Sequence, residues 1–250
     1  MFKTKWAAQA LPIFAVMEDF MEHMETIWDK RFGRTFLKIA AMFTMLCDHI
    51  GFVLVPVNRY PEIYYTLRII GRIAFPLFCF MLVEGFIHTH SRKNYIIRLA
   101  VFAVISEIPF DLSASGIAFD WYSQNVMWTL LIGFIVLCGL ERFEENYLAK
   151  LLVLFAGGIA AYFMCTDYSM FGVFLISILY ICRFNNKIRV ALLGVMVLMQ
   201  GKIEAFAALS IPFIMKYDPD KNDIHFPKYF FYVFYPAHLF ILYLIRGILL

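Results

Sequence analysis

The sequence predicts an all-α membrane protein with about nine transmembrane helices (eight to ten fit the pattern). Three observations lead to this fold class. Of the 250 residues, 62% are hydrophobic and only 16% are charged, whereas an ordinary soluble domain is about half apolar and a quarter charged. The apolar residues gather in long segments, and lysine and arginine alternate between the connections. A net charge of +3 is too small for a basic nucleic-acid-binding surface, so no nucleic-acid partner is expected.

Residues 1–35 differ from the rest of the chain. Apolar residues such as Ile13 and Phe20 recur at helical spacing, with acidic residues such as Glu18 between them. This pattern is typical of an amphipathic helix that lies on a membrane surface. The sequence therefore predicts an interfacial helix over 1–35 and a single transmembrane domain over 36–250.

Nine apolar segments follow the amphipathic helix. A straight helix needs about 20 apolar residues to cross a bilayer. The first, second and last segments meet that length alone, and the middle ones are short enough to be re-entrant or fused. The predicted segments are 36–57, 67–88, 95–110, 125–140, 149–165, 170–182, 188–200, 204–216 and 229–250.

The loop charges predict the orientation in the lipid bilayer. Most of the 22 lysines and arginines fall in alternate connections, the pattern of cytoplasmic loops. We therefore expect a multi-pass protein with a cytoplasmic N-terminus and an outside C-terminus.

The first span carries two adjacent ionisable residues, Asp48 and His49. A charge at bilayer depth costs about 2.5–3.5 kcal/mol on insertion scales, so each requires a reason. Neighbours on a helix point about 100° apart, so the two cannot pair with each other. Each is expected to find a partner on another helix.

The second span holds two i,i+4 pairs. Arg68 and Arg72 lie near its outer end, and Glu84 and His88 near its inner end. The simplest interpretations are arginines reaching the headgroups and a local ion pair at the inner interface. Pro76 is expected to kink the helix between the two pairs.

The third span ends in S-E-I-P-F-D-L, with Glu107 before Pro109 and Asp111 after it. Pro109 is expected to break the helix at Ile108. Asn125 opens the fourth span, where it can act as an N-cap.

Six polar residues are predicted to fall in the outer half of the membrane, and they can converge on a functional cavity. Their signs allow pairs such as Arg72 with Glu107 or Asp111. The alternative is that they only fasten helices together. His238 is expected in the inner third of the last span, level with Glu84 and His88. The six residues are Asp48, His49, Arg72, Glu107, Asp111 and Asn125.

Several blocks in order resemble the TraX family, whose namesake is the conjugative-pilin N-acetyltransferase. The blocks are D-H-I-G, I-G-R-I-A-F-P-L-F-C-F, K-N-Y-I-I-R-L, S-E-I-P-F-D-L, Q-N-V-M and F-Y-P-A-H-L. They cover about residues 36–134 densely and 226–250 more briefly. The resemblance implies a bacterial inner-membrane acyltransferase that uses acetyl-CoA. The acceptor it implies is an amine or hydroxyl on a peptide, pilin or glycan, and the oligomeric state stays open.

Acyl transfer needs a base, an oxyanion donor and a site for the CoA phosphates. On the implied function, His49 is the predicted base. Asp48, Glu107 or Asp111 would orient it or hold the acceptor, and Asn125 or Arg72 would stabilise the oxyanion. The predicted inner rim for CoA holds His90, Arg92, Lys93 and Arg98, and His238 with Glu84 and His88 forms a rival catalytic group.

Two other classes of function stay open. A transporter or flippase would use the charged cavity to bind a solute, and a structural subunit of an envelope complex would use it for packing. The five cysteines contain no C-x-x-C pair, so neither a disulfide framework nor a metal site is expected.

Overall fold

The computed structural model describes residues 31–201, 203–221, 226–227 and 229–249. This part of the chain is all-helical, with two isolated β-bridges and no strand. The predicted amphipathic helix lies almost entirely outside the described residues. The helices are α2 (Arg34–Leu54), α3 (Pro61–Gly71), α4 (Ala74–His88), α5 (Arg92–Ala114), α6 (Val126–Arg142), α7 (Tyr147–Phe163), α8 (Ser169–Ile181), α9 (Asn186–Met199), the 3₁₀ helix η1 (Glu204–Ser210), α10 (Ile211–Met215) and α11 (Phe230–Leu249).

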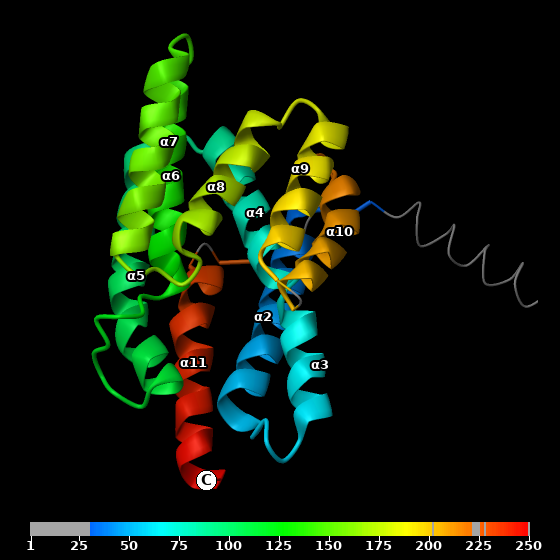
Figure 1. Cartoon of the computed structure of the whole chain (residues 1–250), viewed down its shortest axis with the longest axis vertical. Coiled ribbons are helices and arrows are strands. Elements are labelled where there is room, and N and C mark those ends of the chain that lie inside the picture. The colour runs from blue at the N-terminus through cyan, green and yellow to red at the C-terminus, as the bar shows by residue number, and fades with distance from the viewer. Residues whose placement is uncertain (1–30, 202, 222–225, 228, 250) are drawn as a thin grey trace, which may run out of the picture.

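Helix α4 lies at the centre of the bundle (Figure 1). It contacts α2, α6, α8 and η1, and Phe80 and Phe86 on it are fully buried. A helix that is apolar on all sides is stable only when neighbours surround it. Helices α5, α6 and α7 lie on one side of it, and α9 and α10 on the other.

Asparagines set the starts of three helices. The side chains of Asn125, Asn146 and Asn185 accept hydrogen bonds from the backbone N–H groups of Met127, Ala149 and Ile188. Each bond satisfies one of the N–H groups that a helix start leaves without a partner. The predicted N-cap role of Asn125 is therefore confirmed.

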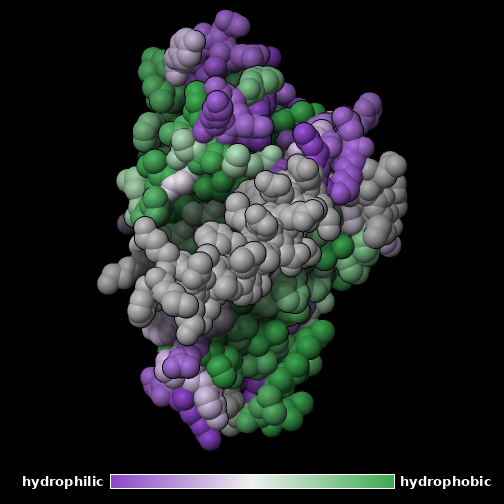
Figure 2. All heavy atoms as spheres, turned by 90° about the vertical axis from the view of Figure 1, so that its right-hand side faces the viewer, coloured by the Kyte–Doolittle hydropathy of each residue, from purple (hydrophilic) through white to green (hydrophobic). Residues whose placement is uncertain are grey.

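Three helical segments of the described chain are long and apolar enough to cross a membrane: Arg34–Leu54, Pro61–His88 and Phe230–Leu249. They correspond to the first, second and last predicted spans. Hydrophilic residues gather toward the two ends of the long axis, with hydrophobic surface between them (Figure 2). Large apolar side chains are exposed on most helices. Together these features indicate a membrane protein.

The second predicted span is divided in two. Helix α3 ends at Gly71 and α4 begins at Ala74. Pro76 has no N–H to donate to the carbonyl of Arg72, and its ring crowds that carbonyl. The interruption therefore falls one turn before the proline, between the two i,i+4 pairs as predicted.

The predicted break at Ile108 is wrong, because α5 continues through Pro109 to Ala114. Arg246 on α11 donates to the carbonyl oxygens of Leu112 and Ser113, both at 2.9 Å. These carbonyls belong to the last turn, which has no intrahelical donors of its own. Packing of α11 along α5 thus holds a helical end that the local sequence disfavours.

Candidate functional site

A polar cavity of about 230 Å³ opens between α2, α3, α4, α11 and the turn that joins α7 to α8. Phenylalanines such as Phe52, Phe75 and Phe78 form much of its wall. Its polar lining comes from segments far apart in the sequence. These polar residues are Asp48, His49, Arg68, Arg72, Ser113, Ser123, Asp167, Tyr168 and Tyr235.

Asp48 lies between Arg68 and Arg72, the two arginines at the end of α3. Its Oδ2 accepts from Nη1 of Arg68 and its Oδ1 from Nη2 of Arg72, each at 2.5 Å. The arginines share a face because they are four residues apart. Asp48 therefore has its expected partner on another helix, and both of its oxygens are engaged. With both oxygens bound to the arginines, Asp48 does not orient His49, in line with the helix geometry that excludes a pair between these neighbours.

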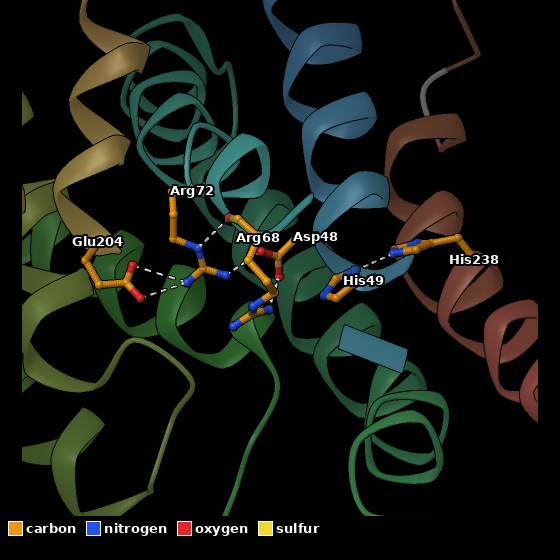
Figure 3. A network of polar contacts seen from close by, with 6 residues as sticks. All are labelled: Asp48, His49, Arg68, Arg72, Glu204 and His238. Carbon is orange, nitrogen blue, oxygen red and sulfur yellow. Dashed lines mark hydrogen bonds and ion pairs between the residues drawn. The ribbon is translucent and has the colours of Figure 1, made fainter. Parts of the chain in front are cut away.

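Glu204 completes this ion-pair network (Figure 3). Nη1 of Arg72 donates to both Glu204 carboxylate oxygens, at 3.0 and 3.1 Å. Nε of Arg72 donates to the carbonyl of Arg68 at 3.3 Å, so each of its three nitrogens has a partner. Two carboxylates balance two guanidiniums. Such mutual neutralisation is what permits charges to lie inside an apolar bundle.

The predicted pairing of Arg72 with Glu107 or Asp111 is therefore wrong. Helix α3 packs against α2 and η1, whereas α5, which carries both acids, packs against α6 and α11. The sequence shows that the charges can cancel, but the packing of the helices decides which pairs form.

His49 and His238 form a second network beside the first (Figure 3). Nδ1 of His49 lies 2.7 Å from Nε2 of His238, and Nδ1 of His238 lies 2.7 Å from the carbonyl oxygen of Phe234. A carbonyl only accepts, so Nδ1 of His238 carries the hydrogen and its Nε2 accepts from His49. This assignment follows from the network. It leaves Nε2 of a neutral His49 unprotonated.

The predicted position of His238 level with Glu84 and His88 is wrong. Helix α11 begins near the middle of the long axis of the molecule and runs to the end that carries the C-terminus (Figure 1). The first turns of α11 therefore lie level with the middle of α2. His238 is 5% exposed and contacts His49, which lines the cavity.

Gly71 makes the close approach of α3 to α2 possible. A Cβ atom at this position would collide with the side chain of Asp48. We expect Gly71→Ala to lower the free energy of unfolding by about 1–3 kcal/mol, the usual cost of overpacking, and to separate Asp48 from its arginines. Thermal unfolding of the purified protein measures this. Gly247→Ala is the matched control, because a Cβ there meets nothing within 4 Å. Equal stability of the two variants would contradict the account.

Asp167 lines the mouth of the cavity from the turn between α7 and α8. Asp167 as a whole is exposed to solvent. The protein around its carboxyl group nevertheless excludes water from it, and this desolvation raises the pKa to about 6, although the positive charge of Arg72 acts in the opposite direction. A raised pKa means that the protonated acid is favoured in the folded state. Asp167 therefore adds to the free energy of unfolding at acidic pH, and this contribution is lost as the pH rises through about 6.

Asp167→Asn tests this titration, because the amide mimics the protonated acid at every pH. We expect the melting temperature of the variant to rise relative to that of the wild type between pH 5 and pH 7.5. Asp220→Asn, on an exposed turn beyond α10, serves as control. A difference between Asp167→Asn and the wild type that does not change with pH would show that Asp167 has an ordinary pKa.

Glu107, Asn125 and Asp111 form a neighbouring cluster that does not line the cavity. Oε2 of Glu107 accepts from Nδ2 of Asn125 at 2.5 Å and from Nε1 of Trp128 at 2.7 Å. Nδ2 of Asn125 also donates to the carbonyl of Ala103. Oδ2 of Asp111 accepts from the backbone N–H of Asp120. These residues tie α5 to the start of α6 and to the loop between them.

The predicted inner residues lie at another place in the bundle. Glu84, His88 and Arg92 line a separate cavity at the ends of α4, α6 and α8. Nδ1 of His88 lies 2.8 Å from the backbone carbonyl oxygen of Glu84 and 3.8 Å from its carboxylate, so the two residues meet as the i,i+4 spacing predicts. Arg92 donates to Glu141 at 3.1 Å and to the carbonyls of Phe86 and Thr89.

Of the other three residues of the predicted rim, His90 is exposed in the bend before α5, and Lys93 and Arg98 lie on α5. Lys93 is exposed in the first turn of the helix. Arg98 lies over the ring of Tyr95, with its Cζ 5.0 Å from the ring centroid. Arg92 lines the cavity at the ends of α4, α6 and α8, whereas Arg98 contacts Tyr95 in the wall of another cavity, so the predicted rim is divided between two places.

The sequence does not indicate that Glu204, Asp167 and Tyr235 belong to the site. For Arg68 it predicts only a contact with lipid headgroups. Glu204 and Asp167 stand at the ends of predicted spans, where charges are ordinary. The packing of η1 against α3 brings Glu204 to Arg72, and the α7–α8 turn brings Asp167 to the cavity. Tyr235 lies in an aromatic run just before Pro236, so its residue type does not distinguish it from its neighbours. Arg68 could have been found, because a buried Asp48 needs a cation.

Comparison with known proteins places the chain in a family. A family model described as TraX protein matches residues 33–246. The probable fimbrial assembly protein FimC, serogroup H1, of Dichelobacter nodosus is 27% identical over 230 residues, which cover 82% of this chain and 92% of that protein. No solved structure matches. The family match spans the cavity, both histidines and the whole ion-pair network, and the chain belongs to the TraX protein family.

Proposed function

We propose that the protein is a membrane-embedded acyltransferase that moves an acetyl group from acetyl-CoA to an amine, with His49 as the general base. The observation that carries this proposal is the ordered histidine pair. His238 fixes the tautomer of His49, so that the unprotonated Nε2 is available beside a cavity of about 230 Å³. A neutral imidazole held in one tautomer is what proton abstraction near pH 7 requires.

The proposed reaction proceeds by direct transfer. The acceptor nitrogen attacks the thioester carbonyl, and Nε2 of His49 takes its proton. The tetrahedral intermediate then collapses, the C–S bond breaks, and the proton passes to the departing thiolate. The products are the N-acetylated acceptor and CoA. His238 does not line the cavity, so it is a positioning residue and not the catalyst.

Arg68 is the oxyanion donor that fits this cavity best. The three nitrogens of Arg72 and the amide nitrogen of Asn125 already have partners. Arg68 lines the cavity and contacts Asp48 through Nη1, and a guanidinium has five N–H donors. It therefore keeps donors for the negative charge that develops on the carbonyl oxygen, and Asp48 holds it in place.

The proposed setting is the bacterial inner membrane, with the N-terminus in the cytoplasm and the C-terminus outside. The alternation of basic residues supports this orientation. The name of the Dichelobacter relative concerns fimbrial assembly, and this supports the N-terminal amine of a pilin-like subunit as acceptor.

Incubation with labelled acetyl-CoA tests the proposal. The full chain in lipid nanodiscs is mixed with a peptide that has a free N-terminal amine, and separately with the same peptide blocked at that amine. We expect label in the free peptide and none in the blocked one. If neither peptide nor water accepts the acetyl group and CoA is not released, the acyltransferase proposal is wrong and a solute carrier is the better explanation of the cavity.

A further inference from the structure

A second, mainly apolar cavity of about 140 Å³ adjoins the polar one. It runs between α2, α4, α5, α6 and α11, with Met81, Leu99 and Leu130 in its wall. The two cavities share four lining residues, and these four residues separate one cavity from the other. The shared residues are Met45, Phe78, Val126 and Tyr235.

Three cations gather at the end of the apolar cavity that is remote from His49. Lys38 and Tyr95 line this end. Arg98 lies over the ring of Tyr95, and Arg34 precedes Lys38 by one turn on α2. Arg34 lies near Tyr95 and also near Tyr217. Basic side chains from α2 and α5 thus meet at one place.

At this place Arg34 and Arg98 each have a hydrogen-bond donor that lacks an acceptor. The Nε atoms of Arg34 and Arg98 are buried, and neither has a hydrogen-bond partner. A buried N–H without a partner costs about 1–3 kcal/mol, more when the group is charged. A phosphate group supplies the acceptor oxygens and the negative charge that these donors lack.

Resting on the acyltransferase function, we propose that Arg34, Lys38 and Arg98 bind the phosphates of the acyl donor, with the pantetheine arm in the apolar cavity and the thioester at His49. The ligand class is a phosphate carrying a thin, mostly apolar arm. This places the phosphates away from the predicted rim at Arg92, whose guanidinium already contacts Glu141.

The dimensions agree with this placement. Lys38 and His49 are eleven residues apart on α2, which corresponds to about 16 Å along the helix axis. A pantetheine arm has as many backbone bonds as about four peptide residues, so its extended length is about 15 Å. A donor held at Lys38 therefore brings its thioester to the level of His49.

Ligand binding to the full chain in phosphatidylcholine nanodiscs tests the inference. The probes are CoA, pantetheine without phosphates, and adenosine 3′,5′-bisphosphate without the arm. We expect CoA to bind tightest and Arg34→Gln and Arg98→Gln each to weaken it at least tenfold. Pantetheine binding should not change in these variants. Lys187→Gln, an exposed lysine in the first turn of α9, is the matched control, and melting temperatures show that each variant is folded. Unchanged CoA affinity in both arginine variants would overturn the inference.

A phospholipid headgroup has the same phosphate chemistry, and the experiment separates the two sources. If the site takes a lipid, native mass spectrometry shows a retained phospholipid that Arg34→Gln and Arg98→Gln lose and that CoA does not displace. That result would overturn the donor assignment. A different result would refute the proposed function alone. If the wild type binds CoA but transfers no acetyl group, the function is wrong and the phosphate site still stands.

Discussion

Replacing His49 by glutamine is expected to reduce the rate of acetyl transfer by at least about 100-fold, the lower end of what a positioned general base contributes. The glutamine amide can still fill the space beside His238, but it cannot take a proton. Because the donor phosphates are proposed to bind elsewhere, the KM for acetyl-CoA should change little while kcat falls. His88→Gln, on a partly exposed histidine of α4, is the matched control and should keep the wild-type rate.

Substitutions of His238 provide a second test of the same hydrogen-bond network. His238→Leu removes the acceptor for Nδ1–H of His49, so the ring is free to present the wrong tautomer and kcat should fall. His238→Gln restores an acceptor oxygen and should recover part of the rate. A structural role alone predicts similar losses in both variants, so rescue by glutamine distinguishes positioning from packing. If His238→Gln lost all activity while His49→Gln kept it, the roles of the two histidines would be reversed.

Asp48→Ala is expected to lower the free energy of unfolding by about 3–5 kcal/mol, the usual effect of removing one partner from a buried ion pair. The Arg72 side chain is 9% exposed, and without Asp48 only Glu204 would face two guanidiniums. Arg68 would also lose the contact that holds it at the cavity, so activity should fall together with stability.

Chemical or thermal unfolding in detergent measures the effect. Arg59→Ala, an exposed arginine in the loop between α2 and α3, is the control for loss of a charge without burial and should change stability by less than about 1 kcal/mol. Equal losses in Asp48→Ala and Arg59→Ala would show that the network does not stabilise the fold.

The sequence predicted the first part of the site well. A buried Asp beside a His required partners from other helices, and the depth of Arg72 marked it as a further candidate, although the partners considered for it were Glu107 and Asp111. These inferences depend only on helix geometry and on the cost of burying a charge. They identified Asp48, His49 and Arg72 before any packing was known.

Other parts could not be predicted, because they depend on where each helix begins in space. His238 was placed by counting from the start of its span, but α11 starts midway along the bundle and brings it to His49. Glu204 reaches Arg72 only because a 3₁₀ helix folds back against α3. The continuation of α5 through Pro109 depends on Arg246 from the other end of the chain.

A single-turnover experiment shows whether His49 takes part in the chemical step. Wild type and His49→Gln, each in excess over labelled acetyl-CoA, are mixed with a peptide that has a free N-terminal amine and quenched at short times. We expect the wild type to move the label from the thioester to the amine in one step, and His49→Gln to bind the donor but leave the label on CoA. Transfer by His49→Gln at the wild-type rate would contradict this expectation.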